Sequence, residues 1–107
     1  MTIRYKNAKV DLTTTNATDI LTIPNATTAV IKSILVSEDS GNADTITLTL
    51  TDSASAIFSL FKVKSVSANT TVELLTAPLV LAESEKITAQ AATANRLHVV
   101  VSYMEIS

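Results

Sequence analysis

The chain has 107 residues, enough for one domain and too few for two. Its net charge of −2 gives no strong field for nucleic acid or an anionic membrane, and the absence of cysteine excludes disulfides, thiolate metal sites and thiol catalysis. The first ten residues hold no apolar core of the kind that a signal peptide needs, so we expect a soluble protein made in the cytoplasm.

The N-terminal segment, residues 1–9, carries Arg4, Lys6 and Lys9 and no acidic residue. Chain termini are loose unless something ties them down. We therefore expect a basic N-terminal arm over residues 1–9 and a single folded domain over residues 10–107. The arm is one candidate surface for contact with a partner.

From Lys9 onward, apolar residues recur with a period of two and many residues are β-branched, which is typical of strands. Stretches of Asn, Asp, Ser and Thr separate the strands and supply the turns, because the chain has one Gly and two Pro. Short strands with polar turns predict an all-β fold, a single antiparallel β-sandwich or jelly roll of about eight strands. The predicted segments are Lys9–Thr13, Asp19–Ile23, Ala29–Glu38, Asp44–Asp52, Ile57–Val66, Thr70–Thr76, Pro78–Ala82, Lys86–Ala91 and Arg96–Ile106.

Two of these strands are apolar on both faces. In Ala29–Glu38, one side holds Val30, Ile34 and Val36 and the other holds Ile31 and Leu35, and Arg96–Ile106 has the same character. Such strands either lie at the centre of a sheet or turn one face toward another subunit.

The strand Asp44–Asp52 has two unlike faces, one apolar and one a row of threonines. Threonine favours strands and avoids the entropy and desolvation costs of burying Lys or Glu at a contact. The threonine row is the second candidate contact surface, although threonine is also a good residue for an exposed strand. The row consists of Thr45, Thr47, Thr49 and Thr51. The predicted core includes Ile46, Leu48, Leu50, Phe61, Leu97, Val99 and Val101.

The strand Ile57–Val66 has an irregular alternation, which slips between Leu60 and Phe61. This slip predicts a β-bulge. Lys62 and Lys64 then share a face, and charges placed in this way often guard the edge of a sheet.

The chain offers few groups for chemistry. His98 is the only histidine, and no cysteine or second histidine accompanies it to form a metal site. A general base needs a positioned partner, and the sequence has neither a G-x-S-x-G elbow nor a glycine-rich phosphate loop. We therefore expect a structural His98, no catalytic residue, no metal site and no cofactor.

Two binding alternatives remain. The acidic loop could offer calcium the oxygen ligands of Glu38, Asp39, Asn42 and Asp44. Its spacing is not that of an EF-hand, however, and a solvated hairpin loop is favoured. A receptor- or carbohydrate-binding module would need Tyr5 or Tyr103 exposed in a pocket beside Asp or Asn.

Most of the chain resembles small all-β virion proteins of tailed bacteriophages, particularly marine ones. The resemblance is carried by "YKNAKVDLTTTNATDILTIPNATTAVIKSILVSEDSGNADTITLTLTD", by "VELLTAPLVLAESEKITAQ" and by the closing "LHVVVSYMEI". Its marks are the apolar-Pro-Asn entry at residues 23–25, a long apolar strand before an acidic loop, the Thr-alternating strand and a "PLVL…ES…I" corner. Related sequences often carry Gly-Asp at that corner, where this chain has Ser84 and Glu85.

The resemblance implies a non-catalytic virion structural protein, made in the host cytoplasm, that decorates or cements a capsid. A tail component or a receptor- or carbohydrate-binding module is the alternative. The implied partners are further copies of the chain, in a homo-oligomer such as a trimer, and a phage capsid or tail protein. Nucleic acid and membrane are not expected partners.

Overall fold

The computed structural model describes the whole chain, from Met1 to Ser107, as nine strands. None of its elements is a helix of the length and apolarity needed to cross a membrane. Every predicted strand is present, and all but the first agree with the prediction to within a few residues at each end. The strands are β1 (Ile3–Leu12), β2 (Thr18–Thr22), β3 (Thr28–Glu38), β4 (Asp44–Thr51), β5 (Ile57–Val66), β6 (Thr70–Glu73), β7 (Leu79–Leu81), β8 (Lys86–Ala91) and β9 (Leu97–Ile106).

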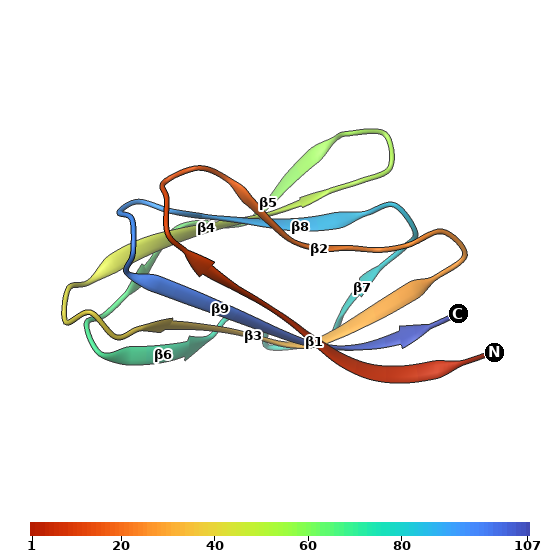
Figure 1. Cartoon of the computed structure of the whole chain (residues 1–107). Coiled ribbons are helices and arrows are strands. Elements are labelled where there is room, and N and C mark those ends of the chain that lie inside the picture. The colour runs from red at the N-terminus through yellow and green to blue at the C-terminus, as the bar shows by residue number, and fades with distance from the viewer.

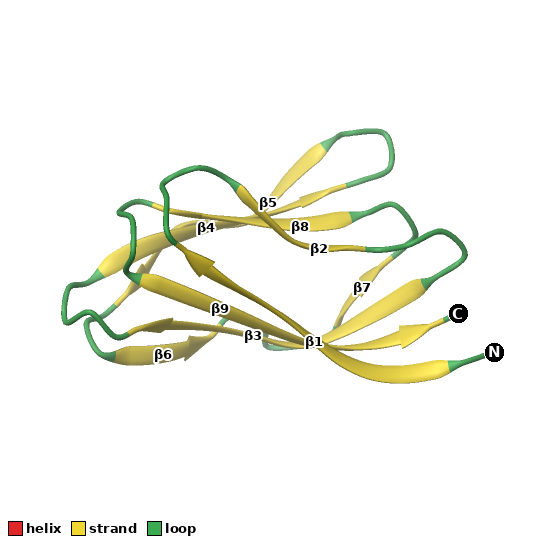
Figure 2. Cartoon of the chain, viewed as in Figure 1, coloured by secondary structure: helices red, strands yellow, loops and turns green.

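The strands form two antiparallel sheets packed face to face (Figures 1 and 2). Sheet A has the order β1-β9-β3-β6, with β7 also paired to β3, and sheet B has the order β2-β8-β4-β5. The pairs are nested: β1 with β9, β2 with β8, β3 with β6 and β7, and β4 with β5. One long hairpin rolled up in this way is a jelly roll, so the predicted fold class is confirmed.

The core lies between the sheets and contains 19 buried apolar residues. Most of the predicted core is confirmed there, including Ile46 and Leu48 of β4 and all three predicted residues of β9. Leu50 and Phe61 are only partly buried and pack against the edge of this cluster. Phe61 lies on β5, an edge strand of its sheet, and Leu50 is the last residue but one of β4.

The N-terminal segment is a strand and not a separate arm. β1 begins at Ile3, and its ten residues pair in continuous register with β9, from Ile3 opposite Ile106 to Leu12 opposite Leu97. Ile3 and Tyr5 lie on the outer face, whereas the apolar residues from Ala8 onward lie on the inner face, so the apolar alternation changes phase within β1. Pairing with β9 makes one continuous strand of this interrupted pattern.

The predicted β-bulge in β5 is confirmed. The register between β4 and β5 shifts twice, between Ile46 and Leu48 and between Leu48 and Thr49. Val63 has a φ of 53°, which is unusual for a β-branched residue, and its N–H donates to Thr47 Oγ1 at 3.1 Å. β5 is also an edge strand, as Lys62 and Lys64 indicated.

The turns use polar residues where other proteins use glycine. Ser55, Asn69, Ser84 and Asn95 all have φ between 55° and 67°. Ser84 stands at the corner where the virion proteins that the sequence resembles often carry glycine, which adopts positive φ without a steric cost.

Candidate functional site

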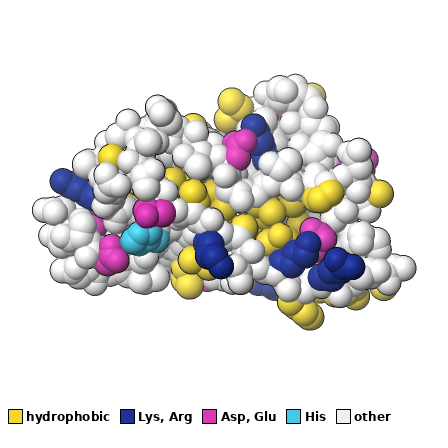
Figure 3. All heavy atoms as spheres, in the orientation of Figure 1, with side chains coloured by type: hydrophobic (Ala, Val, Ile, Leu, Met, Phe, Trp, Pro, Cys, Tyr) yellow, Lys and Arg dark blue, Asp and Glu magenta, His cyan; other side chains and the backbone are white.

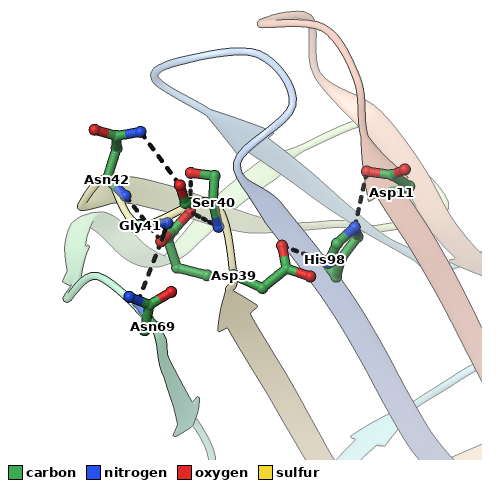
Figure 4. Close-up of polar contacts among 8 residues, drawn as sticks. Asp11, Asp39, Ser40, Gly41, Asn42, Asn69 and His98 are labelled. Atoms are coloured by element: carbon green, nitrogen blue, oxygen red, sulfur yellow. Dashed lines mark hydrogen bonds and ion pairs between the residues drawn. The ribbon is translucent and has the colours of Figure 1, made fainter.

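His98 has two carboxylate partners that the sequence did not reveal. Its Nε2 lies 3.3 Å from Asp11 Oδ1 at the end of β1, and its Nδ1 lies 3.7 Å from Asp39 Oδ1 in the loop after β3 (Figure 4). All three side chains are substantially exposed, so their mutual attraction is weakened by water. A shallow hollow of about 260 Å³ adjoins them, lined by Lys9, Val10, Asp11, His98, Val99 and Val100.

This cluster does not have the form of a catalytic or metal centre. The carboxylates occupy opposite nitrogens of the ring, so the three groups point toward one another and not toward a shared point outside. Ser37 lies opposite His98 in the β3–β9 register, but none of the side-chain hydrogen bonds joins its hydroxyl to the imidazole. No group of three or more His, Cys, Asp or Glu side chains is arranged to hold a metal ion.

The carboxylate of Glu38 organises the loop between β3 and β4. It is 1% exposed and accepts hydrogen bonds from the N–H groups of Ser40, Gly41, Asn42 and Asn69 at 2.9–3.2 Å, and one from the Ser40 hydroxyl (Figure 4). Burial alone would raise the pKa of Glu38. The hydrogen bonds from Ser40, Asn69 and Gly41 outweigh it and lower the pKa to about 2.

The acids of this loop serve three separate structural tasks. Glu38 holds the loop backbone, Asp39 contacts His98, and the buried Asp44 accepts the N–H of Thr93 at 3.1 Å. They do not converge on a common point, which disfavours the calcium interpretation. The prediction of a solvated loop is only partly correct, because two of the three carboxylates, those of Glu38 and Asp44, are buried.

Glu73 plays a similar part in sheet A. It accepts the N–H of Ile34 at 2.8 Å, the N–H of Leu75 at 3.3 Å and the Ser33 hydroxyl, next to a register shift in β3. Burial would raise the pKa of Glu73, but these hydrogen bonds outweigh it and lower the pKa.

The predicted basic residues lie in β1 but on different faces. Successive residues of a strand point to opposite faces. Arg4 and Lys6 therefore face the side of the core, and Lys9 faces outward. Lys6 Nζ lies 3.1 Å from Glu105 Oε1 on β9, and Arg4 stands opposite Glu105 in the register. The three cations therefore do not form one basic patch.

The threonine row lies on the outer face of sheet B, whereas Arg4, Lys6 and Lys9 lie in sheet A. All four threonines are partly buried by neighbouring strands: Thr49, for example, stands between Thr88 of β8 and Ser59 of β5. The face around them holds an exposed ion pair, Lys86 Nζ to Asp19 Oδ2 at 3.4 Å, and two exposed apolar residues of the edge strand β5, Ile57 and Val63. One shallow hollow lies here, lined by Thr45, Thr47, Val63, Gln90, Ala91 and Ala92.

The outer face of sheet A is apolar in two cross-strand rows. One row runs through Val100 and Leu35, which are 36% and 38% exposed, and the other through Tyr5 (80%) and Val80 (59%). In Figure 3, apolar atoms project from the lower rim, where sheet A lies. We call these two rows the apolar face: Val100 and Leu35 in the first, and Tyr5, Met104, Val30 and Val80 in the second.

The two apolar rows explain the strands that are apolar on both sides. β3 and β9 are central in sheet A, and their inner residues are fully buried while their outer ones remain partly exposed. The sequence indicated this face only as one of two alternatives, and its assignment of Val30 and Ile31 was wrong. The register shift between Ile31 and Ser33 turns Ile31 into the core and Val30 to the outer face.

The two tyrosines do not form a sugar-binding pocket. Tyr103 is 7% exposed and belongs to the core, and Tyr5 is exposed on an edge strand. None of the three hollows in the surface has an aromatic residue in its lining.

No family model and no curated protein matches the chain. Among solved structures, a chain from work described as "Bacillus endospore appendages form a novel family of disulfide-linked pili" is similar. The two chains are 13% identical, the match covers 97% of this chain and 86% of that one, and the TM-score is 0.53. At this identity the likeness shows a shared fold: this chain is a β-sandwich of the kind found in that pilus-forming protein.

Proposed function

We propose that this chain is a non-catalytic structural protein that works by assembling into a larger particle. The observation that carries the proposal is the apolar face on the outside of sheet A, which no other part of the chain covers. Single exposed apolar side chains are normal on proteins, but contiguous ones mark contact sites. The second row of the face joins side chains in register across four strands, and the first row joins Val100 and Leu35 on the two central strands.

The polar groups of the chain support the same role. Glu38 and Glu73, the two carboxylates with lowered pKa values, accept hydrogen bonds from the backbone of a loop and of a strand. Their role is therefore structural. His98 sits between two acids, and no hydrogen bond joins it to the hydroxyl of Ser37 on the neighbouring strand. This arrangement favours a scaffold that presents surfaces.

The finer form of the proposal is a decoration or cement protein of a tailed-phage capsid, with a tail component as the alternative position. It rests on the sequence resemblance to phage virion proteins and on the jelly roll, a fold that capsid proteins use. The partners would be further copies of the chain and a capsid or tail protein, and the site of action would be the virion, after synthesis in the host cytoplasm.

A second candidate is a subunit of a filamentous appendage. It is favoured by the structural likeness to the protein that forms disulfide-linked pili. This chain has no cysteine, so its subunits would associate without disulfides.

Immunogold electron microscopy of particles from the cells or lysates that produce this chain tests both candidates. Regular labelling of phage heads supports the decoration protein, and labelling along filaments supports the appendage subunit. If no particle is labelled and the protein sediments as a monomer, the assembly role is wrong.

A further inference from the structure

The two sheets have four edges, and three of them carry features that discourage pairing with another chain. β2 has five residues and a register shift, β5 has two shifts and exposed lysines, and the remaining edge is divided between the short strands β6 and β7. β1 differs from them, because it has ten residues and no register shift. A long, regular edge strand is a template for adding another strand.

The main-chain groups of β1 can be assigned to its two sides. Thr2 and Ser107 exchange both N–H···O bonds, at 2.7 and 2.9 Å. Bonded and non-bonded pairs alternate in an antiparallel ladder, so every second residue of β1, from Ile3 to Asp11, directs its N–H and C=O away from β9. No strand of the chain pairs with this side.

The side of the sandwich next to this edge is incompletely closed. Ala8 and Val10 of β1 and Ile20 of β2 pack against the core but remain partly exposed. Figure 3 shows apolar atoms at the centre of this face, between the two layers. A second molecule placed against β1 would cover them.

The lysines of β1 restrict which strand can pair with this edge. Lys6 is bound by Glu105 at 3.1 Å, whereas Lys9 contacts only the amide oxygen of Asn7, at 3.5 Å. A partner strand must therefore place no cation opposite these residues, since like charges directly opposite destabilise a pair of strands.

We infer that β1 pairs with β1 of a second copy of this chain, antiparallel and about a two-fold axis at Asn7, so that sheet A continues from one subunit into the next. The inference deepens the proposed structural role and rests on it, because it names a second copy as the first assembly partner. In this register Lys9 faces Tyr5 of the other copy, and Lys6 faces Ala8. An exposed tyrosine beside a lysine is a favourable cation–π neighbour.

Other registers are less favourable for identifiable reasons. A continuous sheet keeps outward residues opposite outward residues, so the axis must pass through a residue. An axis at Lys6 or at Lys9 sets that lysine against itself, and an axis at Tyr5 sets Arg4 against Lys6. An axis at Ala8 leaves the main chain of Ile3 unpaired, whereas the axis at Asn7 pairs the outward main-chain groups from Ile3 to Asp11, of which the Asp11 C=O also accepts the N–H of Thr13 at 2.9 Å.

Residue 7 faces only itself in this arrangement, which gives a selective test. Asn7→Glu and Asn7→Lys each place two like charges opposite one another, and each should weaken association several-fold in sedimentation equilibrium. An equimolar mixture of the two should associate at least as strongly as the unmodified protein, because opposite charges then meet. The same pair of changes at Ser59, on the edge strand β5, is the control and should have no effect.

Cross-linking tests the register independently. The only cysteine of an Asn7→Cys variant would meet its counterpart at a Cα separation of about 5.5 Å, within the range of a disulfide, and should form a dimer on oxidation. Ser59→Cys should not. Equal association of Asn7→Glu, Asn7→Lys and the unmodified protein, or equal cross-linking of the two cysteine variants, would overturn the inference. If particles are still labelled with the Asn7→Glu variant, the structural role stands without β1 pairing.

Discussion

At the scale of single residues, Glu38 makes the stability of the folded state depend on pH. Its pKa is lowered from the ordinary value of 4.5 to about 2, so the ionised form stabilises the folded state above pH 4.5 and this stabilisation is lost as the pH falls toward 2. We expect Glu38→Gln to lower the free energy of unfolding at pH 7, with a difference from the unmodified protein that narrows between pH 4.5 and 2. Urea unfolding at several pH values measures it. A difference that is constant with pH would contradict the role of the ionised carboxylate.

Two leucines of β4 provide a matched test of the core. Leu48 is fully buried, whereas Leu50, two residues on, is only partly covered. We expect Leu48→Ala to cost about 2–5 kcal/mol of unfolding free energy, because it leaves a cavity, and Leu50→Ala to cost clearly less. Chemical denaturation of both variants compares them, and equal losses would show that Leu50 is as enclosed as Leu48.

His98 is the residue whose surroundings sequence reasoning missed. Asp11 and Asp39 reach it from β1 and from the loop after β3, and no spacing in the sequence brings these segments together. Because all three side chains are substantially exposed, we expect His98→Ala to change the unfolding free energy by no more than about 1 kcal/mol. A loss of several kcal/mol in thermal unfolding, or loss of a measured hydrolysis, would assign His98 a larger role.

At the scale of elements, the period-two pattern was enough to find nearly every strand. The exception is β1, where the apolar residues change face: Ile3 and Tyr5 lie on the outer face, and Ala8 and Val10 lie on the inner face. This change of phase conceals the first half of the strand in the sequence. The pairing with β9, at the other end of the chain, continues without a shift through both halves.

Removal of residues 1–9 tests this correction. A loose arm could be deleted without affecting the domain, but the structure places seven of the nine residues, Ile3–Lys9, in β1. The deletion leaves β9 as a new edge strand that is apolar on both faces. We expect the deletion to lower the unfolding temperature, measured by circular dichroism, and to cause aggregation, measured by light scattering. Deletion of Met1 alone is the control, and a nine-residue deletion that unfolds like the full chain would restore the arm.

At the scale of the whole molecule, the two outer faces of the sandwich differ in character. Sheet B presents the threonine row, an exposed ion pair and the exposed Ile57 and Val63 of its edge strand β5, while sheet A presents apolar rows that run across its central strands. The sequence allowed the jelly roll to be predicted, because its strands alternate with period two and polar turns separate them evenly. It did not show which face stays uncovered, since this depends on which strands become neighbours: β3 and β9 adjoin in sheet A although they lie far apart in the chain.

The apolar face gives the last prediction. Val100→Asp places a charge in the first row of this face, beside Leu35, where the residue is 36% exposed, so the folded subunit can keep the charge in water. Burying that charge in an interface would be costly, and we expect the variant to fold normally yet assemble or bind particles at least tenfold more weakly. Thr49→Asp, on the outer face of sheet B, is the matched control and should assemble normally. Co-sedimentation with particles measures binding, and circular dichroism of each variant checks that it is folded. If Thr49→Asp disrupts assembly and Val100→Asp does not, the threonine row is the contact surface and the apolar face is not.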